Sequence, residues 1–388
     1  MKETIRLFDK DAYATEFEST VISCESREGG SFAVILEETL FFPEEGGQSP
    51  DKGTLEGCPV VDVQIKKGVI THMVKEALEP GARVTGRICW EHRFSNMQQH
   101  SGEHIFSGLV YRLYGCRNVG FHLSDQNVTM DFDAPLTQEE LEAVETEANR
   151  AIVQNIETKV SYPTQEELNA LEYRSKIAID GQVRIVTIPG YDVCACCAPH
   201  VRRTGEIGLL KIMGVTSHKG GVRVNMLCGF RALQSFREKN RIVSQLVSML
   251  STQQEDLPRQ VERLKDTIYG LKGRLAEAAK KRLEATILRL PEDQESLLLF
   301  VRDVETEVAR DCVNTWMGKH SGICAIFMEQ ETGGCHFILG SLHKDCREIA
   351  AVLRTGLGAK CGGSRTMIQG SLEAGRERVE EVLELSAE

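Results

Sequence analysis

The sequence predicts a mixed α+β protein that begins with a small β-barrel. Short β-rich runs punctuated by glycines fill the first part of the chain, and helices with an apolar period alternate with extended runs in the rest. With 388 residues, the chain is long enough for two or three domains. We divide it by pattern into a barrel (1–88), an α+β core (89–230), a long helical segment (231–294) and a small C-terminal α/β domain (295–388).

Residues 1–88 contain several short runs that are typical of strands. Three of them are Phe32–Leu36, Val60–Ile65 and Val69–Val74. Glycines that favour turns separate the runs, as at Gly29-Gly30 and Gly68. Short strands with frequent turns indicate a small barrel or sandwich, and we expect the barrel.

The core changes to helical periodicity. Apolar residues recur at helical spacing over residues 91–114, and Gly115 is a natural stop. Thr137–Ile152 is predicted to be a helix, because Thr137 and Glu140 have the spacing of a capping box. Further expected elements are a short helix at Thr164–Leu171 and extended runs at Val119–Phe132, Glu157–Tyr162, Val183–Ile188, Ile207–Val215 and Val222–Cys228.

A heptad-like stripe marks the helical segment. Apolar side chains over 231–290 alternate in steps of three and four, which is typical of helices that pack or dimerise. Asp256-Leu257-Pro258 interrupts the stripe, so we expect two long helices that form a hairpin. In the C-terminal domain we expect strands at Leu297–Val301, Ile323–Glu329 and Cys335–Leu339 and helices at Val304–Met317, Asp345–Thr355 and Ser371–Leu385.

Composition excludes several classes of protein. The net charge of −11 argues against a protein that coats nucleic acid by bulk charge, although a local basic surface stays open. We find no apolar leader and no apolar run that would span a bilayer, so we expect no membrane partner. The odd number of cysteines, 13, fits reduced thiols and a cytoplasmic location.

Two short motifs carry metal-ligand chemistry. His100 and His104 are four residues apart on the predicted helix, so both imidazoles lie on one face. Cys196 and His200 repeat this spacing on a predicted turn, with Cys194 and Cys197 as spare candidates. Either pair alone is more often ordinary surface or structure, but three histidines and one cysteine together suit Zn²⁺.

A competing interpretation uses the same helix. His100–His104 has the pattern H-x-x-E-H, which is also that of inverzincin metalloproteases. Glu103 would then be the general base, and a downstream glutamate would be the third ligand. Cys196 and His200 would have no role, which counts against this hypothesis.

Three segments resemble alanyl-tRNA editing domains. Thr39–Gln48 resembles their glycine-rich motif T-x-F-Y-P-E-G-G-G-Q, and Arg93–His100 resembles the stretch that leads into their H-x-x-x-H. Cys196–Val201 resembles their C-G-G-T-H-V, and the order and separations also fit. The chain therefore resembles the long form of the free-standing AlaX editing proteins. In addition, Cys361–Gly370 resembles a motif of the C-terminal domain of alanyl-tRNA synthetase, which contributes there to tRNA binding and oligomerisation.

The chain departs from the family pattern at three places. Glu45 replaces a glycine of the glycine-rich motif, next to the loop expected to approach the tRNA end. Cys197-Ala198-Pro199 replaces G-G-T and changes the surroundings of Cys196. Thr366 stands where the family has aspartate in the C-terminal motif.

The resemblance implies a zinc-dependent hydrolase that acts in trans. Its substrate would be tRNA(Ala) wrongly charged with serine, and glycine is a second candidate. The zinc ligands would be His100, His104, Cys196 and His200; the catalytic residues would be Thr39, Gln48 and Glu103; and the substrate would bind to Thr39, Gly46, Gly47, Gln48 and Arg93. Glu103 is either a base or a supporting partner of a ligand, with the supporting role preferred. Thr39 is expected to bond the seryl hydroxyl.

Two other function classes stay open. One is a non-catalytic tRNA-binding module with a structural zinc, and the other is the H-x-x-E-H protease. Residues 259–284 carry eight basic and four acidic side chains. This excess of positive charge gives modest support to tRNA binding, whether the protein is the hydrolase or the non-catalytic module. The helical and C-terminal regions also suggest a homodimer.

Overall fold

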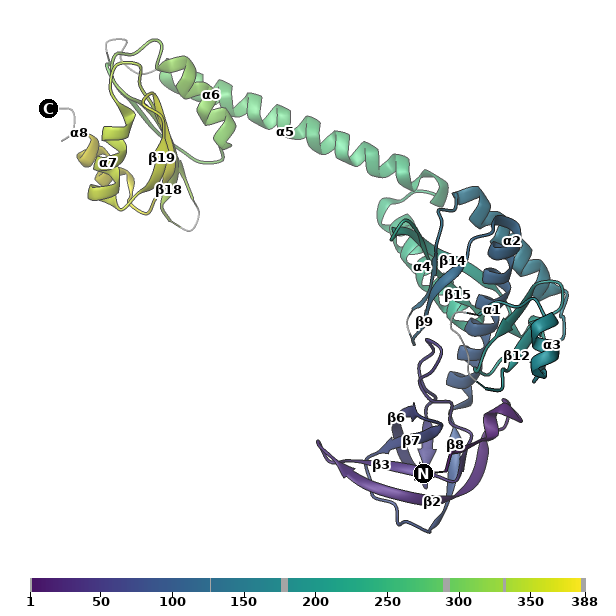
Figure 1. The fold of residues 1–388 in the computed structure, drawn as a ribbon. Coiled ribbons are helices and arrows are strands. Elements are labelled where there is room, and N and C mark those ends of the chain that lie inside the picture. Colours follow the sequence, from purple (N-terminus) through teal and green to yellow (C-terminus); the bar gives the residue numbers. More distant parts are fainter. Residues whose placement is uncertain (1, 126, 176–180, 289–293, 331–332, 385–388) are drawn as a thin grey trace. The chain divides into compact units, whose positions relative to one another are not determined.

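The computed structural model describes residues 2–125, 127–175, 181–288, 294–330 and 333–384 (Figure 1). These residues form two compact units, Met1–Val243 and Ser244–Glu388. Each unit contains sheets and helices, so the predicted mixed α+β class is confirmed. Within the described residues, no helix combines the length and the apolar composition that crossing a bilayer requires.

The first unit begins with a closed β-barrel. Its strands follow the order β2-β3-β7-β6-β5-β8. They are β2 (Glu16–Arg27), β3 (Ser31–Leu36), β5 (Gly53–Leu55), β6 (Cys58–Lys66), β7 (Val69–Val74) and β8 (Arg83–Ile88). Alternate residues point inward, as in β7, where Ile70, His72 and Val74 are fully buried. The predicted runs at 32–36, 60–65 and 69–74 are all strands of this barrel.

A short parallel pair leads from the barrel to the glycine-rich motif. β1 (Ile5–Arg6) pairs with β4 (Glu38–Thr39), and a 3-10 turn at Leu7–Asp9 follows β1. Thr39 ends β4, so the motif begins at the end of this two-stranded sheet and continues into a loop. At the end of this loop Gln48 lies beside β9 (Asn118–Leu123), where it forms a parallel bridge with Leu123.

The core of the first unit is a long helix against two antiparallel sheets. The helix is α1 (Trp90–Tyr114), and the sheets have the orders β14-β15-β10-β9 and β11-β12-β13. The other elements are β10 (Val128–Phe132), α2 (Gln138–Val153), β11 (Lys159–Ser161), α3 (Gln165–Ala170), β12 (Ile185–Ile188), β13 (Asp192–Ala195), a 3-10 turn (Thr204–Ile207), β14 (Leu210–His218) and β15 (Gly221–Cys228). The capping box of Thr137 and Glu140 at the start of α2 is confirmed.

Two expected strands of the core are corrected. The run expected at 119–132 is two antiparallel strands, β9 and β10, and the N–H of Ser124 donates to the carbonyl oxygen of Asn127 at 3.0 Å between them. The strand expected at 207–215 begins later, since Thr204–Ile207 is a 3-10 turn and β14 starts at Leu210.

Two helices follow the core. α4 (Gly229–Leu250) and α5 (Leu257–Ile287) are joined through a 3-10 turn at Gln254–Asp256, and Pro258 lies in the first turn of α5. The predicted break is therefore confirmed, whereas the hairpin arrangement stays a prediction. The apolar stripe of α5 lies exposed on the described chain. Its residues are Val261, Leu264, Ile268, Leu271 and Leu275.

The second unit contains a five-stranded sheet of order β16-β17-β18-β20-β19 with helices beside it (Figure 1). Its elements are β16 (Leu297–Val301), α6 (Thr306–Trp316), β17 (Cys324–Glu329), β18 (Cys335–Gly340), α7 (Cys346–Leu357), β19 (Lys360–Gly363), β20 (Met367–Leu372) and α8 (Arg376–Glu384). The helix expected at Ser371–Leu385 is wrong at its start, because Ser371 pairs with Lys360 and His336 in β20. Its last residue, 385, lies outside the described residues.

Candidate metal centre

Two histidines lie one turn apart on the buried side of α1. The helix ends at Gly115, whose left-handed backbone (φ +69°) caps it. His100 and His104 are 3% and 1% exposed, and their ring centroids lie 5.4 Å apart. The shared helical face predicted from their spacing is confirmed.

The second pair lies on the turn that follows β13. Arg184 donates from Nη1 to the carbonyl oxygen of Cys196 at 2.8 Å, which holds the start of the turn. The backbone N–H of Val201 donates to Ser101 Oγ on α1 at 3.1 Å, which holds its end next to His200. The contact between Val201 and Ser101 therefore holds the cysteine turn against the helix that carries His100 and His104.

The two pairs meet in one cluster. The ligand atoms of His100, His104, Cys196 and His200 all lie within 4.8 Å of one another. Cys196 Sγ lies 3.5 Å from His100 Nε2 and 3.3 Å from His200 Nε2. A tetrahedral zinc with bonds of about 2.0 Å to nitrogen and 2.3 Å to sulfur separates neighbouring ligand atoms by about 3.3–3.6 Å. The residues thus fit a zinc ion and form a candidate metal site.

Each imidazole of the cluster has a partner at its other ring nitrogen, Nδ1. The distances are 2.7 Å from His100 to Gln48 Oε1, 3.0 Å from His200 to Ser101 Oγ and 2.9 Å from His104 to Asp192 Oδ2. The last contact has the distance of an ion pair, although its direction is poor for a hydrogen bond. With Nδ1 occupied in every ring, Nε2 is the atom left for the metal.

Asp192 is itself held by a half-buried arginine, Arg174. Arg174 donates from Nε to Asp192 Oδ1 at 2.7 Å and from Nη2 to Oδ2 at 2.9 Å. Burial alone would raise the pKa of Asp192, but His104 and Arg174 outweigh it and hold that pKa below its ordinary value. His104, Asp192 and Cys194 form a second group with metal-ligand chemistry, yet Arg174 engages both oxygens of the carboxylate. We therefore assign Asp192 a supporting role.

The thiol of Cys196 lies in surroundings that favour the ligating thiolate. Burial opposes ionisation, but the facing imidazoles of His100 and His200 outweigh it and hold the pKa of Cys196 well below its ordinary value. For the neighbouring Cys197, burial and the charge of Cys196 act together to raise the pKa. Of the two adjacent cysteines, Cys196 is therefore the better metal ligand.

Glu103 is buried beside the cluster and is engaged by polar side chains. It accepts hydrogen bonds from Ser107 Oγ at 2.8 Å and Asn118 Nδ2 at 2.6 Å. One carboxylate oxygen lies 3.9 Å from His104 Nε2. These contacts favour the supporting role over the base, and both roles stay predictions.

The glycine-rich motif reaches the cluster through its last three residues. Gly47 has a φ of +81°, and a Cβ on it would lie 2.3 Å from the carbonyl oxygen of Phe121, so only glycine fits there. A Cβ on Gly46 would lie 3.5 Å from Cys197 Sγ, which places this loop over the cysteine turn. Gln48 follows with its side-chain oxygen on His100, while its Nε2 is buried without a hydrogen-bond partner among the described residues.

Thr39 lies at the other end of the motif and is outside the cluster. Its side chain is fully buried, and Oγ1 accepts a hydrogen bond from the N–H of Phe41 at 3.1 Å. The same oxygen lies 2.9 Å from Nε2 of His72 in the barrel. The structure thus connects Thr39 to a buried histidine that the sequence patterns do not single out.

Arg93, for which we expect substrate contact, is fully buried at the start of α1. Its Nε donates to both carboxylate oxygens of Asp51 at 3.0 Å, and its two other nitrogens donate to the carbonyl oxygens of Ala12 and Leu40. These contacts tie α1 to the glycine-rich segment. They support a positioning role, and direct contact with substrate stays a prediction that they do not favour.

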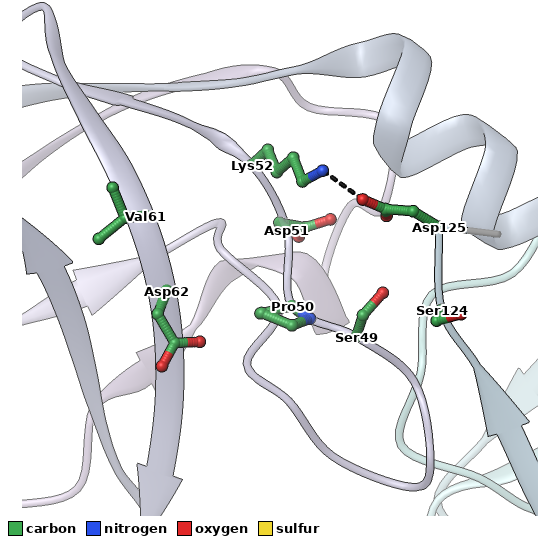
Figure 2. Close-up of a pocket in the computed structure, with 8 residues that line it drawn as sticks. All are labelled: Ser49, Pro50, Asp51, Lys52, Val61, Asp62, Ser124 and Asp125. Carbon is green, nitrogen blue, oxygen red and sulfur yellow. Dashed lines mark hydrogen bonds and ion pairs between the residues drawn. The ribbon is translucent and has the colours of Figure 1, made fainter. Parts of the chain in front are cut away.

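A separate pocket lies just past the glycine-rich motif (Figure 2). It is lined by Ser49, Pro50, Asp51, Lys52, Val61, Asp62, Ser124 and Asp125. Lys52 points toward Asp125, with which it forms an ion pair. The four metal-ligand candidates do not line this pocket, so the chemistry of the site rests on the cluster.

Sequence patterns identify the ligand candidates and Gln48, but they miss the other partners of the ligand candidates. Asp192 and Arg174 have no motif of their own, and His72 stands alone in a strand. The only available signal is the nearness of Asp192 to the cysteine segment and of Ser101 to His100. The fold is what brings these side chains next to the histidines of the cluster.

Comparisons with known proteins match two segments of the chain to family models. Residues 183–225 match the model described as threonyl and alanyl tRNA synthetase second additional domain. Residues 10–92 match the model described as tRNA synthetases class II (A). The first match contains Cys196 and His200, and the second contains the glycine-rich motif.

Known relatives match about two thirds of the chain. The alanyl-tRNA editing protein Aarsd1 of Mus musculus is 31% identical over 277 residues, which cover 67% of each chain. Aarsd1-A of Xenopus laevis is 32% identical over 68% of each chain. The alanine–tRNA ligase of Methanothrix thermoacetophila is 35% identical over 68% of this chain and 30% of its own.

A solved structure matches a smaller share. The crystal structure of the C-Ala domain from Aquifex aeolicus alanyl-tRNA synthetase covers 23% of this chain and 85% of its own, at 18% identity and a TM-score of 0.21. That score is too low to establish a shared fold, so the likeness predicted for the C-terminal domain stays a prediction.

Proposed function

The chain belongs to the family of alanyl-tRNA editing proteins, and we propose that it hydrolyses the ester bond of tRNA(Ala) that carries the wrong amino acid. The observation that carries this proposal is the contact between Gln48 and His100, which joins the glycine-rich motif to the metal-ligand cluster. Two motifs of the family resemblance thereby form one site. We propose that the chain acts on tRNA that another enzyme has charged.

The metal we propose is Zn²⁺, held by His100, His104, Cys196 and His200. When bound, it supplies Lewis-acid polarisation of an ester or a bound water, or, with all four ligands engaged, a fixed anchor for the acceptor end. The mixed nitrogen and sulfur donors and their spacing support this choice.

The chain's own residues would orient the ester. Gln48 Nε2 is a buried donor with no partner among the described residues, so it is free to donate to an oxygen of the substrate. Glu103 would hold the site through Ser107 and Asn118 and hydrogen-bond no substrate atom. Gly46 and Gly47 would let the backbone approach the terminal nucleotide closely.

Serine is the amino acid that we propose for the main substrate. Thr39 would bond the seryl hydroxyl, which alanine lacks, and such a bond is a strong basis for discrimination. Glycine is smaller than alanine and would enter the same space without that bond. We therefore expect seryl-tRNA(Ala) to be preferred over glycyl-tRNA(Ala).

Exposed basic residues support the tRNA partner. They lie along α5 and are Arg259, Arg263, Lys265, Lys272, Arg274, Lys280, Lys281 and Arg282. Phosphate contacts of this kind supply affinity without base specificity. The exposed apolar stripe of the same helix supports a homodimer through the helical region, which sedimentation of the full chain would test.

The decisive experiment is deacylation of purified substrates. Wild type and His104→Ala would be incubated with seryl-tRNA(Ala) and with alanyl-tRNA(Ala), and the remaining ester would be measured. We expect the zinc-loaded wild type to cleave the seryl ester and the variant to lose activity. A folded, zinc-loaded wild type that binds tRNA but cleaves neither ester would favour a binding module, and cleavage of peptides would favour the protease.

A further inference from the structure

His72 is a fully buried histidine whose ring lies between two oxygen atoms of the barrel. Its Nε2 lies 2.9 Å from Thr39 Oγ1, and its Nδ1 lies 3.2 Å from the carbonyl oxygen of Val34. The edge of the ring also contacts Phe41, with ring centroids 5.4 Å apart. A histidine so enclosed has one orientation, and both of its nitrogens are committed.

The partners determine where the imidazole carries its proton. A carbonyl oxygen can only accept, so Nδ1 of His72 must donate to Val34. Burial lowers the pKa of His72 to about 4, against the opposing effect of the bond to Val34, so the ring is neutral near pH 7. A neutral imidazole with its proton on Nδ1 has a bare Nε2. The Thr39 hydroxyl is therefore the donor in the bond between them.

The Thr39 hydroxyl is left with acceptor capacity alone. A hydroxyl has one proton and two lone pairs. The proton goes to His72, and one lone pair accepts the N–H of Phe41 at 3.1 Å. The second lone pair has no further partner in the part of the chain that the structure describes. A substrate group that meets this oxygen must donate a hydrogen bond.

We propose that His72 is a positioning residue that sets the specificity of editing, because it fixes the Thr39 proton away from the substrate and leaves Thr39 an obligate acceptor. This inference rests on the proposed function and on contact between Thr39 and the substrate side chain. A seryl hydroxyl donates to such an oxygen. An alanyl methyl does not, and neither does the fluorine of 3-fluoroalanine, which is close to a hydroxyl in size but can only accept.

The test compares seryl-tRNA(Ala) with 3-fluoroalanyl-tRNA(Ala) as substrates of the zinc-loaded full chain. Wild type is expected to prefer the seryl ester strongly in kcat/KM. In His72→Leu the Thr39 proton is free to turn toward the substrate, so this preference should fall about tenfold, the worth of one hydrogen bond. His72→Gln offers an amide oxygen to Thr39 and an amide N–H to Val34, and it should keep the preference. Ile70→Val on the same strand is the matched control for a small change in the barrel core.

The outcomes separate the two proposals. If wild type does not cleave seryl-tRNA(Ala) at all, the proposed function fails and the role of His72 falls with it. If wild type is active but His72→Leu keeps the wild-type preference, only the role of His72 is overturned. The role of His72 is also overturned if His72→Gln, at equal zinc content, loses as much of the seryl preference as His72→Leu does. Should His72→Leu fail to fold, His72→Asn replaces it, since its shorter amide does not reach Thr39.

Discussion

The side-chain oxygen of Gln48 lies 2.7 Å from Nδ1 of His100, although the two residues are 52 positions apart in the chain. Because the amide oxygen can only accept, the imidazole must carry its proton on Nδ1, which leaves Nε2 for the proposed zinc. The contact joins the glycine-rich motif, for which we propose substrate contact, to the candidate metal site.

Replacing Gln48 by leucine should therefore lower zinc affinity as well as activity. Loss of a partner at Nδ1 of a ligating histidine typically costs 10- to 100-fold in metal affinity. We expect a shift in this range, measured by competition with a chromophoric chelator, together with slower deacylation. Gln64→Leu, an exposed glutamine on β6, serves as the control. Unchanged zinc affinity with reduced activity would restrict Gln48 to a role on the substrate.

Asp192→Asn should lower zinc affinity through His104, as Gln48→Leu should through His100. The carboxylate lies 2.9 Å from His104 Nδ1 and is paired with Arg174, so an amide would lose both the charge and the fixed orientation. We expect zinc affinity to fall about 10- to 100-fold. Asp131→Asn removes another carboxylate that is paired with an arginine, Arg223, and should leave affinity unchanged. Equal affinity in Asp192→Asn and wild type would show that this carboxylate does not support the site.

Thr39→Val tests the selectivity of the proposed reaction. Valine keeps the shape but removes the oxygen, so the seryl hydroxyl loses its acceptor. We expect the ratio of kcat/KM for seryl over alanyl ester to fall about tenfold or more. Thr71→Val, on β7 of the same barrel, is the matched control. Selectivity that survives the loss of the Thr39 hydroxyl would place seryl recognition elsewhere.

The candidate metal ligands were predictable from sequence because their chemistry is confined to two short motifs. His100 and His104 lie one helical turn apart, and Cys196 and His200 share a turn, so each pair is a local pattern. Other partners of the candidate ligands are not local: Arg174 reaches Asp192 because it lies beside β13, where it forms a parallel bridge with Cys194. Such contacts depend on which residues of neighbouring segments pair, and residue spacing in the sequence does not predict that pairing.

The fold shows the same division between local and distant information. The barrel strands and α2 follow from alternation, helical period and a capping box, which are local signals. β20 was missed because Gly370 and Ser371 have weak strand propensity, and the strand is stabilised by pairing with β18 and β19 on its two sides. A strand in the interior of a sheet is hydrogen-bonded on both sides, so it depends less on the strand propensity of its own residues than an edge strand does.

Stability should depend on pH through His72. Burial lowers its folded-state pKa to about 4, whereas the pKa of a histidine in the unfolded chain is about 6.5. The unfolded chain therefore takes up the proton first, so the free energy of unfolding falls as pH drops from about 6.5 to 4, by about 3 kcal/mol for this group. Urea unfolding of wild type and His72→Gln at pH 7 and pH 4 checks the difference. Parallel losses in the two proteins would contradict the assignment.

Arg93 and Asp51 offer the clearest test of the positioning role proposed for the start of α1. Both side chains are buried almost completely, and the arginine also donates to Ala12 and Leu40. Arg93→Met leaves the Asp51 charge buried and unpaired, which typically costs about 3–5 kcal/mol, whereas Arg93→Met combined with Asp51→Leu removes that charge and should recover part of the loss. Urea unfolding measures the cost for each variant. If Arg93 only positions the helix, the variants that still fold should keep the wild-type KM for tRNA, whereas a raised KM at undiminished stability would assign Arg93 to substrate contact.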